Sequence, residues 1–341
     1  MTITPQATVP HLLKDSDLTP ARILRLLDLA ADLKQHHRSG TERQELSGRA
    51  FALIFEKPST RTRSAFEIAA YQQGGTSTYI DSHSSHLGDT ESVADTAQVL
   101  SRLYDGIAYR GYQQSRAESL AAAAAVPVFN ALTDRWHPTQ ALADLLTIRE
   151  HSLRPLSASS VCFAGDGNDN VAASLLVSGA SLGVDVRIAA PEPLWPDADT
   201  LREANERADA VGGRRPTVTT DLREATAGVD FIYTDVWVSM GEPEGIWGDR
   251  VHQLLPYRVD RAVMEGTGNP ATKFLHCLPS IHDGSTRVGA RIADEFELVG
   301  AEVSDDVFRS SRSLVFDQAE NRMHTIKAVL VDAARRVRGI G

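Results

Sequence analysis

One stretch of the sequence constrains the fold more than any other, because an apolar run passes there directly into a helical pattern. Residues 50–55 are all apolar, which is typical of a buried strand. Pro58 cannot continue such a strand, and Ser59 is a favourable N-cap for the segment that follows. Phe66 and Ala69 lie on one face of the predicted helix. The stretch therefore predicts a buried strand joined to a helix by a short junction.

The junction between that strand and that helix has the composition of an anion site. Residues 59–62 combine the free backbone N–H groups of a helix N-terminus with three hydroxyl groups and a guanidinium. Such groups suit the oxygens of a phosphate, and each charge-assisted hydrogen bond contributes about 1.5–3 kcal/mol. An ordinary capped helix with exposed arginines is the alternative, and the second arginine, Arg63, favours phosphate. The predicted anion-binding residues are Ser59, Thr60, Arg61 and Thr62.

The bulk composition argues against several other classes of protein. The 341 residues suffice for two domains with substantial cores. A formal net charge of −10 argues against a nucleic-acid partner or an anionic membrane surface. No apolar segment approaches the length that spans a bilayer, and residues 1–20 lack the basic and apolar regions of a secretory signal. The chain has only Cys162 and Cys277, so we expect a cytoplasmic protein without disulfides.

Strands and helices alternate along the chain, which indicates an α/β fold of two mostly parallel sheets flanked by helices. A polar, turn-rich segment at 151–160 divides this alternation into two halves. In the first half we expect strands at 50–55, 106–111 and 126–130, and a break followed by a short strand within 74–80. In the second half we expect strands at 161–164, 185–190, 230–234 and 273–278, and a long amphipathic helix at 318–338.

Several chemically distinctive side chains follow predicted strand ends, where parallel sheets bind ligands. Arg110 ends one strand, although a solvated surface charge is the commoner role of an arginine. His137 stands before Pro138 at the start of a helix and is equally well explained as a helix-cap histidine. Asp235 follows the strand at 231–234, where a carboxylate suits a cationic amine and a capped turn is an equal alternative.

The cysteines and the loop histidines do not by themselves establish a nucleophile or a metal site. Cys277 follows His276 at a strand end, without any further signature of nucleophilic catalysis. Cys162 lies in the middle of a predicted strand, where a cysteine is usually a small buried hydrophobe. His83 and His86 lie in a polar loop without cysteine or carboxylate ligands at zinc spacing. We therefore predict no metal.

A glycine-rich turn after the strand at 161–164 partly matches a dinucleotide-binding fingerprint. Residues 165–167 are Gly-Asp-Gly, but Asn170 replaces the third glycine of that fingerprint. No acidic residue clearly ends the next strand at 185–190, where the fingerprint requires one. A nicotinamide-dependent dehydrogenase is therefore the weakest alternative, and we predict no cofactor.

Taken together, the motifs resemble the aspartate/ornithine carbamoyltransferase family over almost the whole chain. The segments 235–241 and 276–279 are similar to the ornithine-specific members. The segment at 165–170 differs from the commoner GDxRNN form at Asn168 and Asp169 but retains Asn170. The motifs are FEKPSTRTR, ESVADTAQVLSRLYDGIAYRG, HPTQALADLLTIRE, GDGNDN, DVWVSMGE, HCLPSIHD and FDQAENRMHTIKA.

This resemblance implies a carbamoyl-phosphate domain at 1–150, an ornithine domain at 151–320 and a C-terminal helix at 321–341 that packs back on the first domain. It also implies a homotrimer or an assembly of trimers, in which His86 reaches in from a loop of a neighbouring subunit. The implied carbamoyl-phosphate contacts are Ser59, Thr60, Arg61, Thr62, His86, Arg110, His137, Pro138, Thr139, Gln140, Cys277, Leu278 and Arg322. The implied ornithine contacts are Asn170, Asp235, Ser239 and Met240.

The implied reaction transfers the carbamoyl group of carbamoyl phosphate to the δ-amine of L-ornithine, with L-citrulline and phosphate as products. The δ-amine must attack as a free base, and deprotonating an amine of pKa about 10.4 at neutral pH costs about 4–5 kcal/mol. A position between Cys277 and Asp235 would lower this cost. The alternatives are transfer to putrescine or an N-modified ornithine, and a non-catalytic binding protein of the same fold. The implied catalytic residues are Arg110, His137, Cys277 and Asp235.

Overall fold

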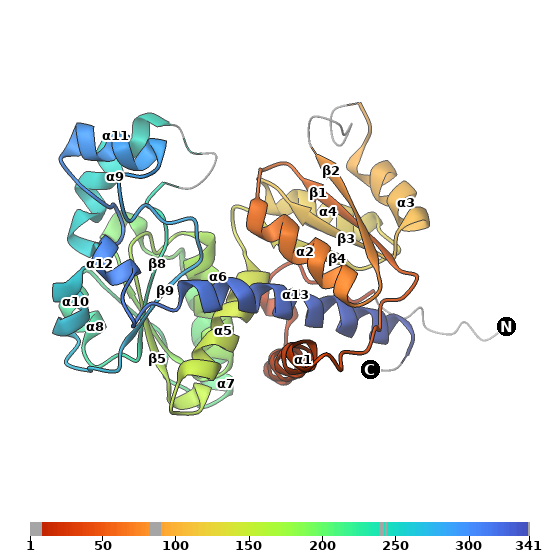
Figure 1. Ribbon diagram of the computed structural model, residues 1–341, viewed down its shortest axis with the longest axis horizontal. Coiled ribbons are helices and arrows are strands. Elements are labelled where there is room, and N and C mark those ends of the chain that lie inside the picture. The colour runs from red at the N-terminus through yellow and green to blue at the C-terminus, as the bar shows by residue number, and fades with distance from the viewer. Residues whose placement is uncertain (1–8, 82–89, 239–241, 243, 340–341) are drawn as a thin grey trace. The chain divides into compact units, whose positions relative to one another are not determined.

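The computed structural model describes residues 9–81, 90–238, 242 and 244–339 (Figure 1). The chain forms two compact units, of which the first contains residues 1–142 and 322–341 and the second contains residues 143–321. Each unit is built on one sheet whose strands are all parallel. The predicted α/β class with two parallel sheets is confirmed. Within the described part of the chain, no helix combines the length and the apolar character needed to cross a bilayer.

The sheet of the first unit has the strand order β2-β1-β3-β4. Its strands are β1 (Ala50–Phe55), β2 (Thr76–Asp81), β3 (Gly106–Arg110) and β4 (Val128–Leu132). The chain adds β2 on one side of β1 and then crosses to the other side for β3. The gap between the carboxyl ends of β1 and β3 is thus the switch point at which such sheets bind ligands.

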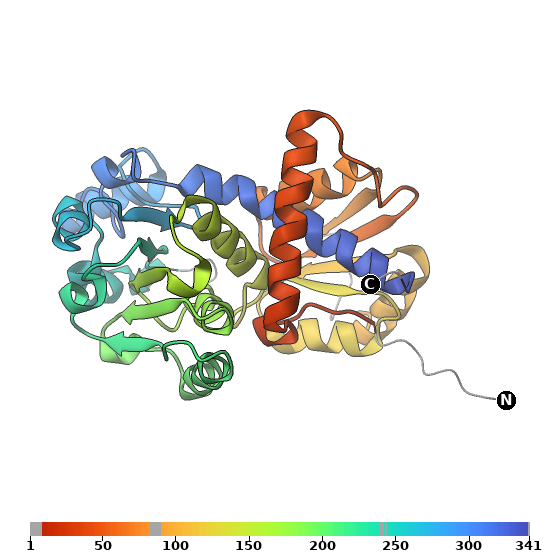
Figure 2. The same ribbon diagram turned by 90° about the horizontal axis from the view of Figure 1, so that it is seen from below.

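Helices cover both faces of this first sheet. On one face, α3 and α4 pack apolar side chains against Ala52, Ile54 and Ile107. On the other face, Leu330 and Ala333 of α13 lie beside Phe51, and Figure 2 shows α1 crossing α13 in this unit. The helices are α1 (Pro20–Ser39), α2 (Thr60–Gln72), α3 (Val93–Leu103), α4 (Gln114–Ala123) and the part of α13 (Val315–Val337) after Asn321.

The sheet of the second unit has the strand order β7-β6-β5-β8-β9, so its switch point lies between β5 and β8. The short edge strand β7 was not predicted, because three residues carry too little periodicity to be recognised. The strands are β5 (Ser160–Ala164), β6 (Asp185–Ala189), β7 (Thr217–Thr219), β8 (Phe231–Thr234) and β9 (Lys273–His276).

The core of the second unit lies on both faces of its sheet. On one face, Ile232 and Phe274 pack with Trp247, Met264 and Ile292 from the helices that follow β8 and β9. On the other face, α6 lies over β6. The α-helices are α5 (Pro138–His151), which begins in the first unit, α6 (Asn170–Ser181), α7 (Ala198–Ala210), α8 (Leu222–Thr226), α9 (Trp247–Leu254), α10 (Arg261–Gly266), α11 (Arg287–Phe296) and α12 (Asp305–Phe308). Short 3-10 helices occupy Asp15–Asp17, Leu156–Ala158, Glu192–Leu194, Glu244–Ile246 and Leu255–Tyr257.

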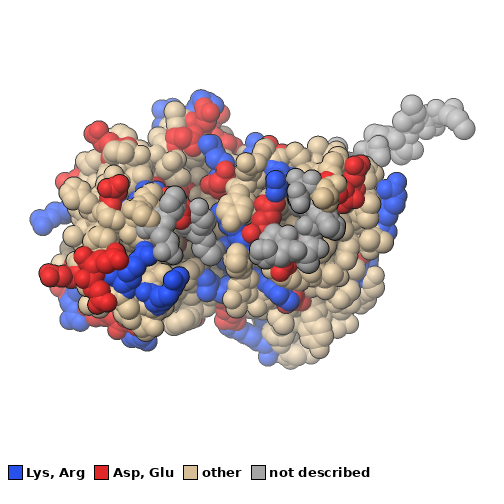
Figure 3. Space-filling view, turned by 90° about the horizontal axis from the view of Figure 1, so that it is seen from above, with Lys and Arg blue, Asp and Glu red and all other residues tan. Residues whose placement is uncertain are grey.

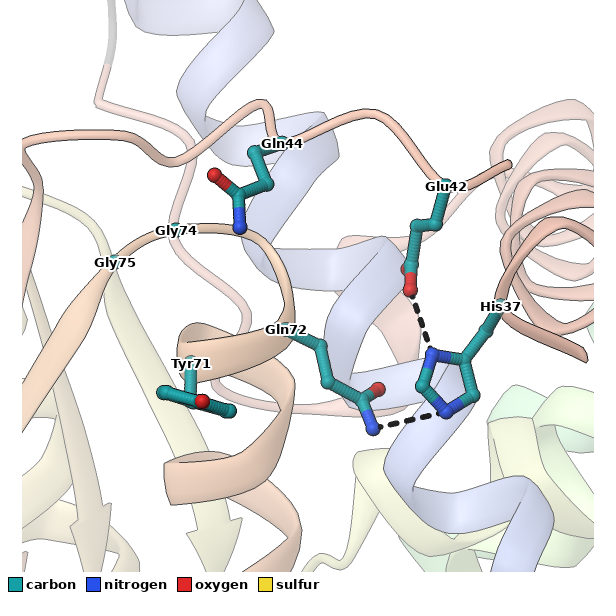
Figure 4. Close-up of a pocket in the computed structure, with 7 residues that line it drawn as sticks. All are labelled: His37, Glu42, Gln44, Tyr71, Gln72, Gly74 and Gly75. Carbon is teal, nitrogen blue, oxygen red and sulfur yellow. Dashed lines mark hydrogen bonds and ion pairs between the residues drawn. The ribbon is translucent and has the colours of Figure 1, made fainter. Parts of the chain in front are cut away.

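A buried ion pair ties α13 to the loop after α1 in the first unit. The fully buried Lys327 donates from Nζ to Oε1 of Glu42 at 2.5 Å. The same carboxylate accepts hydrogen bonds from Gln73 at 2.7 Å and from His37 Nδ1 at 2.9 Å. Figure 4 shows Glu42, His37 and Gln72 at the edge of an open hollow of about 420 Å³ that contains none of the predicted site residues. The Glu42 carboxylate therefore joins α1, α2 and α13.

We expect Lys327→Met to lower the free energy of unfolding by about 3–5 kcal/mol, because it leaves the Glu42 carboxylate buried without its cation. Urea denaturation followed by circular dichroism measures this change. The matched control is Arg202→Met, which breaks an exposed ion pair with Asp199 and should cost less than about 1 kcal/mol. Equal losses in the two variants would contradict a special role for the buried pair.

Candidate active site

The first group of predicted residues meets at the carboxyl ends of β1 and β3. Thr62, in the first turn of α2, is fully buried, and its Oγ1 accepts hydrogen bonds from Arg110 at 3.2 Å and from Arg322 at 2.7 Å. A hydroxyl has two acceptor lone pairs and one hydrogen, so this hydroxyl keeps its hydrogen to donate to a ligand. Two guanidinium groups held at one oxygen supply the charge and the hydrogen-bond donors that suit an anion.

His137 joins this group as a neutral base. Burial, with the charges of Arg322 and Arg110, lowers the pKa of His137 well below its ordinary value. Its Nε2 lies 2.7 Å from an Arg322 nitrogen, which donates because a guanidinium has no acceptor. The hydrogen of the neutral ring is therefore on Nδ1, which lies 3.4 Å from the Thr139 hydroxyl. The imidazole adds polarity without a third positive charge.

Local backbone features deliver these side chains to the edge of the sheet. Ser59 caps α2, with its Oγ accepting the N–H of Thr62 at 3.3 Å. Arg110 follows a register shift between β3 and β4, an irregularity that redirects a side chain at a strand end. At the start of α5, Pro138, Thr139 and Gln140 are buried beside His137, whereas the side chains of Thr60 and Arg61 are exposed.

The positive charge of this group is hidden from the surface. Arg110 is 3% exposed and Arg322 is 5% exposed. On the molecular face drawn in Figure 3, acidic and basic side chains are interspersed. An acidic protein thus concentrates two cations inside a site, where their field is screened less by solvent than at the surface.

A polar network that the sequence did not reveal holds the loop before His137. Asn130 donates from Nδ2 to the Leu13 carbonyl at 2.8 Å and to the Thr133 hydroxyl at 3.2 Å. The same hydroxyl accepts the N–H of Trp136 at 3.3 Å. The only sequence signal is an asparagine inside an apolar strand, which is uncommon in a core without such partners.

The second group of predicted residues lies at the carboxyl ends of β8 and β9. One side-chain donor or acceptor atom from each of Asp235, His276 and Cys277 lies within 4.8 Å of the others. Burial, followed by the nearby Asp235 carboxylate, raises the pKa of the Cys277 thiol well above its ordinary value. The thiol is therefore protonated at neutral pH and is not set up as a nucleophile, since the thiolate is the attacking form.

Carboxylates give this second group a negative potential. Asp144 and Asp169 act with Asp235 on the Cys277 thiol, and all three favour its protonated form. Burial raises the pKa of Asp235, although His276 and Cys277 oppose the shift. Such surroundings attract a cationic amine, and a carboxylate of raised pKa accepts a proton more readily than an ordinary one.

A buried histidine–carboxylate pair holds the backbone around Cys277. Nδ1 of His276 accepts the N–H of Leu278 at 3.0 Å, so Nε2 carries the hydrogen and donates to Oε1 of Glu302 at 3.2 Å. Burial by itself would raise the pKa of Glu302, but hydrogen bonds from His276 and from the Ile281 N–H hold it below its usual range. Leu278 has a left-handed φ of 59°, a strain of about 1–3 kcal/mol that this network offsets. Glu302 gave no sequence signal.

Both ring nitrogens of His276 are thus engaged within the protein.

The loop after β5 carries the remaining described candidate, Asn170, as the first residue of α6. Asp169 caps this helix by accepting the N–H of Val171 at 2.6 Å. The aspartate that departs from the GDxRNN form therefore has a structural role. Arg250 connects this loop to the next, with ion pairs to Asp166 and to Glu242 at 2.9 Å each. Sequence reasoning missed Arg250. His83, His86, Ser239 and Met240 lie outside the described residues.

The fold and these two groups define the chain as a two-unit α/β protein with polar residues gathered at the carboxyl ends of two parallel sheets. Residues 10–150 match the carbamoyl-P binding domain of the aspartate/ornithine carbamoyltransferases, and residues 157–332 match their Asp/Orn binding domain. The chain therefore belongs to the aspartate/ornithine carbamoyltransferase family, as the motifs predicted.

Named relatives and solved structures agree with this assignment. The chain is 54% identical over 323 residues to a catabolic ornithine carbamoyltransferase of Pseudomonas putida, covering 94% of this chain and 96% of that protein. It is 57% identical over 314 residues to a catabolic ornithine carbamoyltransferase of Burkholderia mallei, covering 91% and 93%. It is similar to the solved ornithine carbamoyltransferase from Pyrococcus furiosus, with a TM-score of 0.86, 39% identity and coverage of 96% and 97%.

We expect both cysteines to react slowly with iodoacetamide between pH 7 and 9, because the raised pKa of each thiol suppresses the reactive thiolate. Burial raises the pKa of Cys162 to about 12. Reaction should accelerate only above the ordinary thiol range, and should become fast at pH 8.5 in urea. Mass spectrometry of the alkylated peptides measures both sites. Rapid alkylation of native Cys277 at pH 7 would contradict the protonated thiol.

Proposed function

We propose that this chain transfers the carbamoyl group of carbamoyl phosphate to the δ-amine of L-ornithine, forming L-citrulline and phosphate. The observation that carries the proposal is the opposite electrostatic character of the two groups of residues. Thr62 and His137 accompany two guanidinium groups in the first, whereas three carboxylates raise the pKa of the thiol in the second. An anionic donor and a cationic acceptor require such a pair of sites. The names of the relatives supply the identities of the two substrates.

In this proposal the first unit binds the carbamoyl phosphate. Its phosphate takes hydrogen bonds from the N-terminus of α2, from the Thr62 hydroxyl and from Arg110 and Arg322. His137 and Gln140 hold the carbamoyl group, and Ser59, Thr60, Arg61, Pro138 and Thr139 complete the first-unit site. As the acceptor attacks, negative charge develops on the carbonyl oxygen, and nearby guanidinium and hydroxyl donors stabilise it. The family resemblance adds His86, Cys277 and Leu278 to the carbamoyl-phosphate contacts.

The second unit binds ornithine through Asn170, Asp235, Ser239 and Met240. Asp235, whose raised pKa makes it a better base than an ordinary carboxylate, takes the proton that the δ-ammonium must lose. The protonated Cys277 is a hydrogen-bonding partner of the reacting groups. The amine nitrogen then bonds to the carbamoyl carbon, and the bond from that carbon to the phosphate oxygen breaks. Phosphate leaves with the electron pair and takes the second proton from the newly bonded nitrogen. No covalent enzyme intermediate forms.

The proposal extends to the assembly and its location. It places the chain in the cytoplasm as a homotrimer or an assembly of trimers, on the strength of the family resemblance. It assigns residues 1–150 to the carbamoyl-phosphate domain, residues 151–320 to the ornithine domain and residues 321–341 to the returning helix.

We expect citrulline to form from carbamoyl phosphate with ornithine, and with neither putrescine, aspartate nor N-acetylornithine. Putrescine lacks the α-carboxylate that a site for an amino acid recognises, and aspartate presents no side-chain amine. A colorimetric ureido assay with the four acceptors in parallel measures the specificity. Robust product with another acceptor would overturn the ornithine half of the proposal, and no product with any acceptor would favour the binding-protein alternative.

Two substitutions should separate the two halves of the site. Arg322→Met should raise the KM for carbamoyl phosphate about 10²-fold or more, because it removes charge-assisted hydrogen bonds of about 1.5–3 kcal/mol each. Asp235→Asn should lower kcat about 10²- to 10⁴-fold through loss of the base, with little change in that KM. Steady-state kinetics with each substrate varied measures both effects. The control is Asp199→Asn at the surface, which should leave both KM values and kcat unchanged. If the two test variants had equal effects with both substrates, the assignment of Arg322 to carbamoyl phosphate and of Asp235 to ornithine would be contradicted.

A further inference from the structure

We propose that Glu56 is a positioning residue for carbamoyl phosphate, acting through Arg110. This inference rests on the proposed function. Glu56 lies immediately after β1 and three residues before Ser59, and its side chain is only 10% exposed. It is not among the residues that contact the phosphate in the proposed site. Its contacts instead hold the end of β3, from which Arg110 extends.

The backbone and side chain of Glu56 together engage the chain on both sides of Arg110. The N–H of Glu56 donates to the carbonyl of Arg110 itself at 2.8 Å. Before Arg110, the hydroxyl of the fully buried Tyr109 donates to Glu56 Oε2 at 2.8 Å. After it, the N–H of Tyr112 points to the same oxygen at 3.4 Å. The backbone that carries the Arg110 guanidinium is therefore wrapped around one carboxylate group.

A close approach at Gly111 shows how tight this wrapping is. A Cβ atom on Gly111 would lie 2.0 Å from the Tyr109 hydroxyl oxygen and 2.6 Å from Glu56 Oε2. Real Cβ atoms do not approach other atoms so closely, so only glycine lets the chain pass over the Tyr109–Glu56 hydrogen bond. The turn after Arg110 is thus built around this contact.

Arg110 needs such support because the sheet does not hold it regularly. The pairing of β3 with β4 shifts register between Tyr109 and Arg110, which pair with Asn130 and Leu132 respectively. A bulge of this kind bends the strand and aims the next side chain. Its direction is then set by contacts outside the regular ladder, and Glu56 supplies them.

A cation from α4 balances the charge of Glu56. Arg116, in the first turns of α4, donates from its guanidinium to Glu56 Oε1. This hydrogen bond, with burial opposing it, raises the pKa of Arg116. The carboxylate is thus held from α4 while its other oxygen holds the β3 end, and Thr62 lies six residues further along the same chain. The Glu56 side chain therefore sets the distance between Arg110 and the predicted anion-binding residues at 59–62.

The test is a double-mutant cycle between Glu56→Gln and Arg110→Met. Glu56→Gln should raise the KM for carbamoyl phosphate about 10- to 100-fold, because a shift of about 1 Å in a binding group has effects of this size. The KM for ornithine should change less than about 3-fold. In the Arg110→Met background, Glu56→Gln should add little further loss, since the residue through which it acts is absent. Tyr109→Phe, a milder change, should show the same pattern with a smaller effect.

Isothermal titration with inorganic phosphate separates this inference from the proposed reaction. Weaker phosphate binding by Glu56→Gln than by the unmodified chain supports the inference even if no acceptor yields product. The matched control is Glu67→Gln, which removes the same charge from an exposed i,i+4 pair with Arg63 and should leave phosphate binding unchanged. A lowered melting temperature with unchanged phosphate affinity, or a full Glu56→Gln effect in the Arg110→Met background, would overturn the inference.

Discussion

The hydroxyl of Thr62 is the point on which the rest of the first unit converges. It accepts hydrogen bonds from Arg110 and Arg322, which are 48 and 260 residues away along the chain. Bringing two guanidinium groups to one buried oxygen is unfavourable unless strand order, a bulge and the returning helix all hold them there. The Glu42–Lys327 pair, which fixes α13, therefore serves the same end as the sheet. A fold that holds Arg110 and Arg322 at the Thr62 hydroxyl has the positive charge that an anion requires.

The two units have the same architecture, but the first gathers cationic side chains and the second gathers carboxylates. In each, the strand order reverses beside the first strand of the sheet. In the first unit the polar residues follow β1 and β3 at that reversal, whereas in the second they follow β8 and its neighbour β9. In the first unit a neutral His137 avoids a third positive charge. In the second, a protonated Cys277 avoids a further negative charge among the carboxylates. Burial produces both shifts, since it disfavours the charged form of either group.

Much of the fold and part of the site could be predicted from the sequence. The apolar run at 50–55 and the Ser59 cap correspond to β1 and to the start of α2. The motif resemblance to the family was confirmed over both halves of the chain. Glu302 and Arg250 could not be found in this way, because each acts on a loop distant in sequence and neither belongs to a local pattern. Glu56 belongs to the FEKPSTRTR motif, but the motif did not reveal its contacts, because its partners Tyr109 and Arg116 lie more than fifty residues away.

By itself, the sequence determined the elements, their parallel class and the residue types at each strand end, because periodicity, caps and turn residues are local properties of the chain. Only the tertiary structure decided which strand ends are neighbours. The order β2-β1-β3-β4 places Arg110 beside the first turn of α2, and α13 brings Arg322 to the same Thr62 hydroxyl. The tertiary structure also decided that His137 is neutral and that the Cys277 thiol is protonated. The physical reason is that strand order, burial and mutual charge depend on contacts between segments far apart in sequence, which no local pattern encodes.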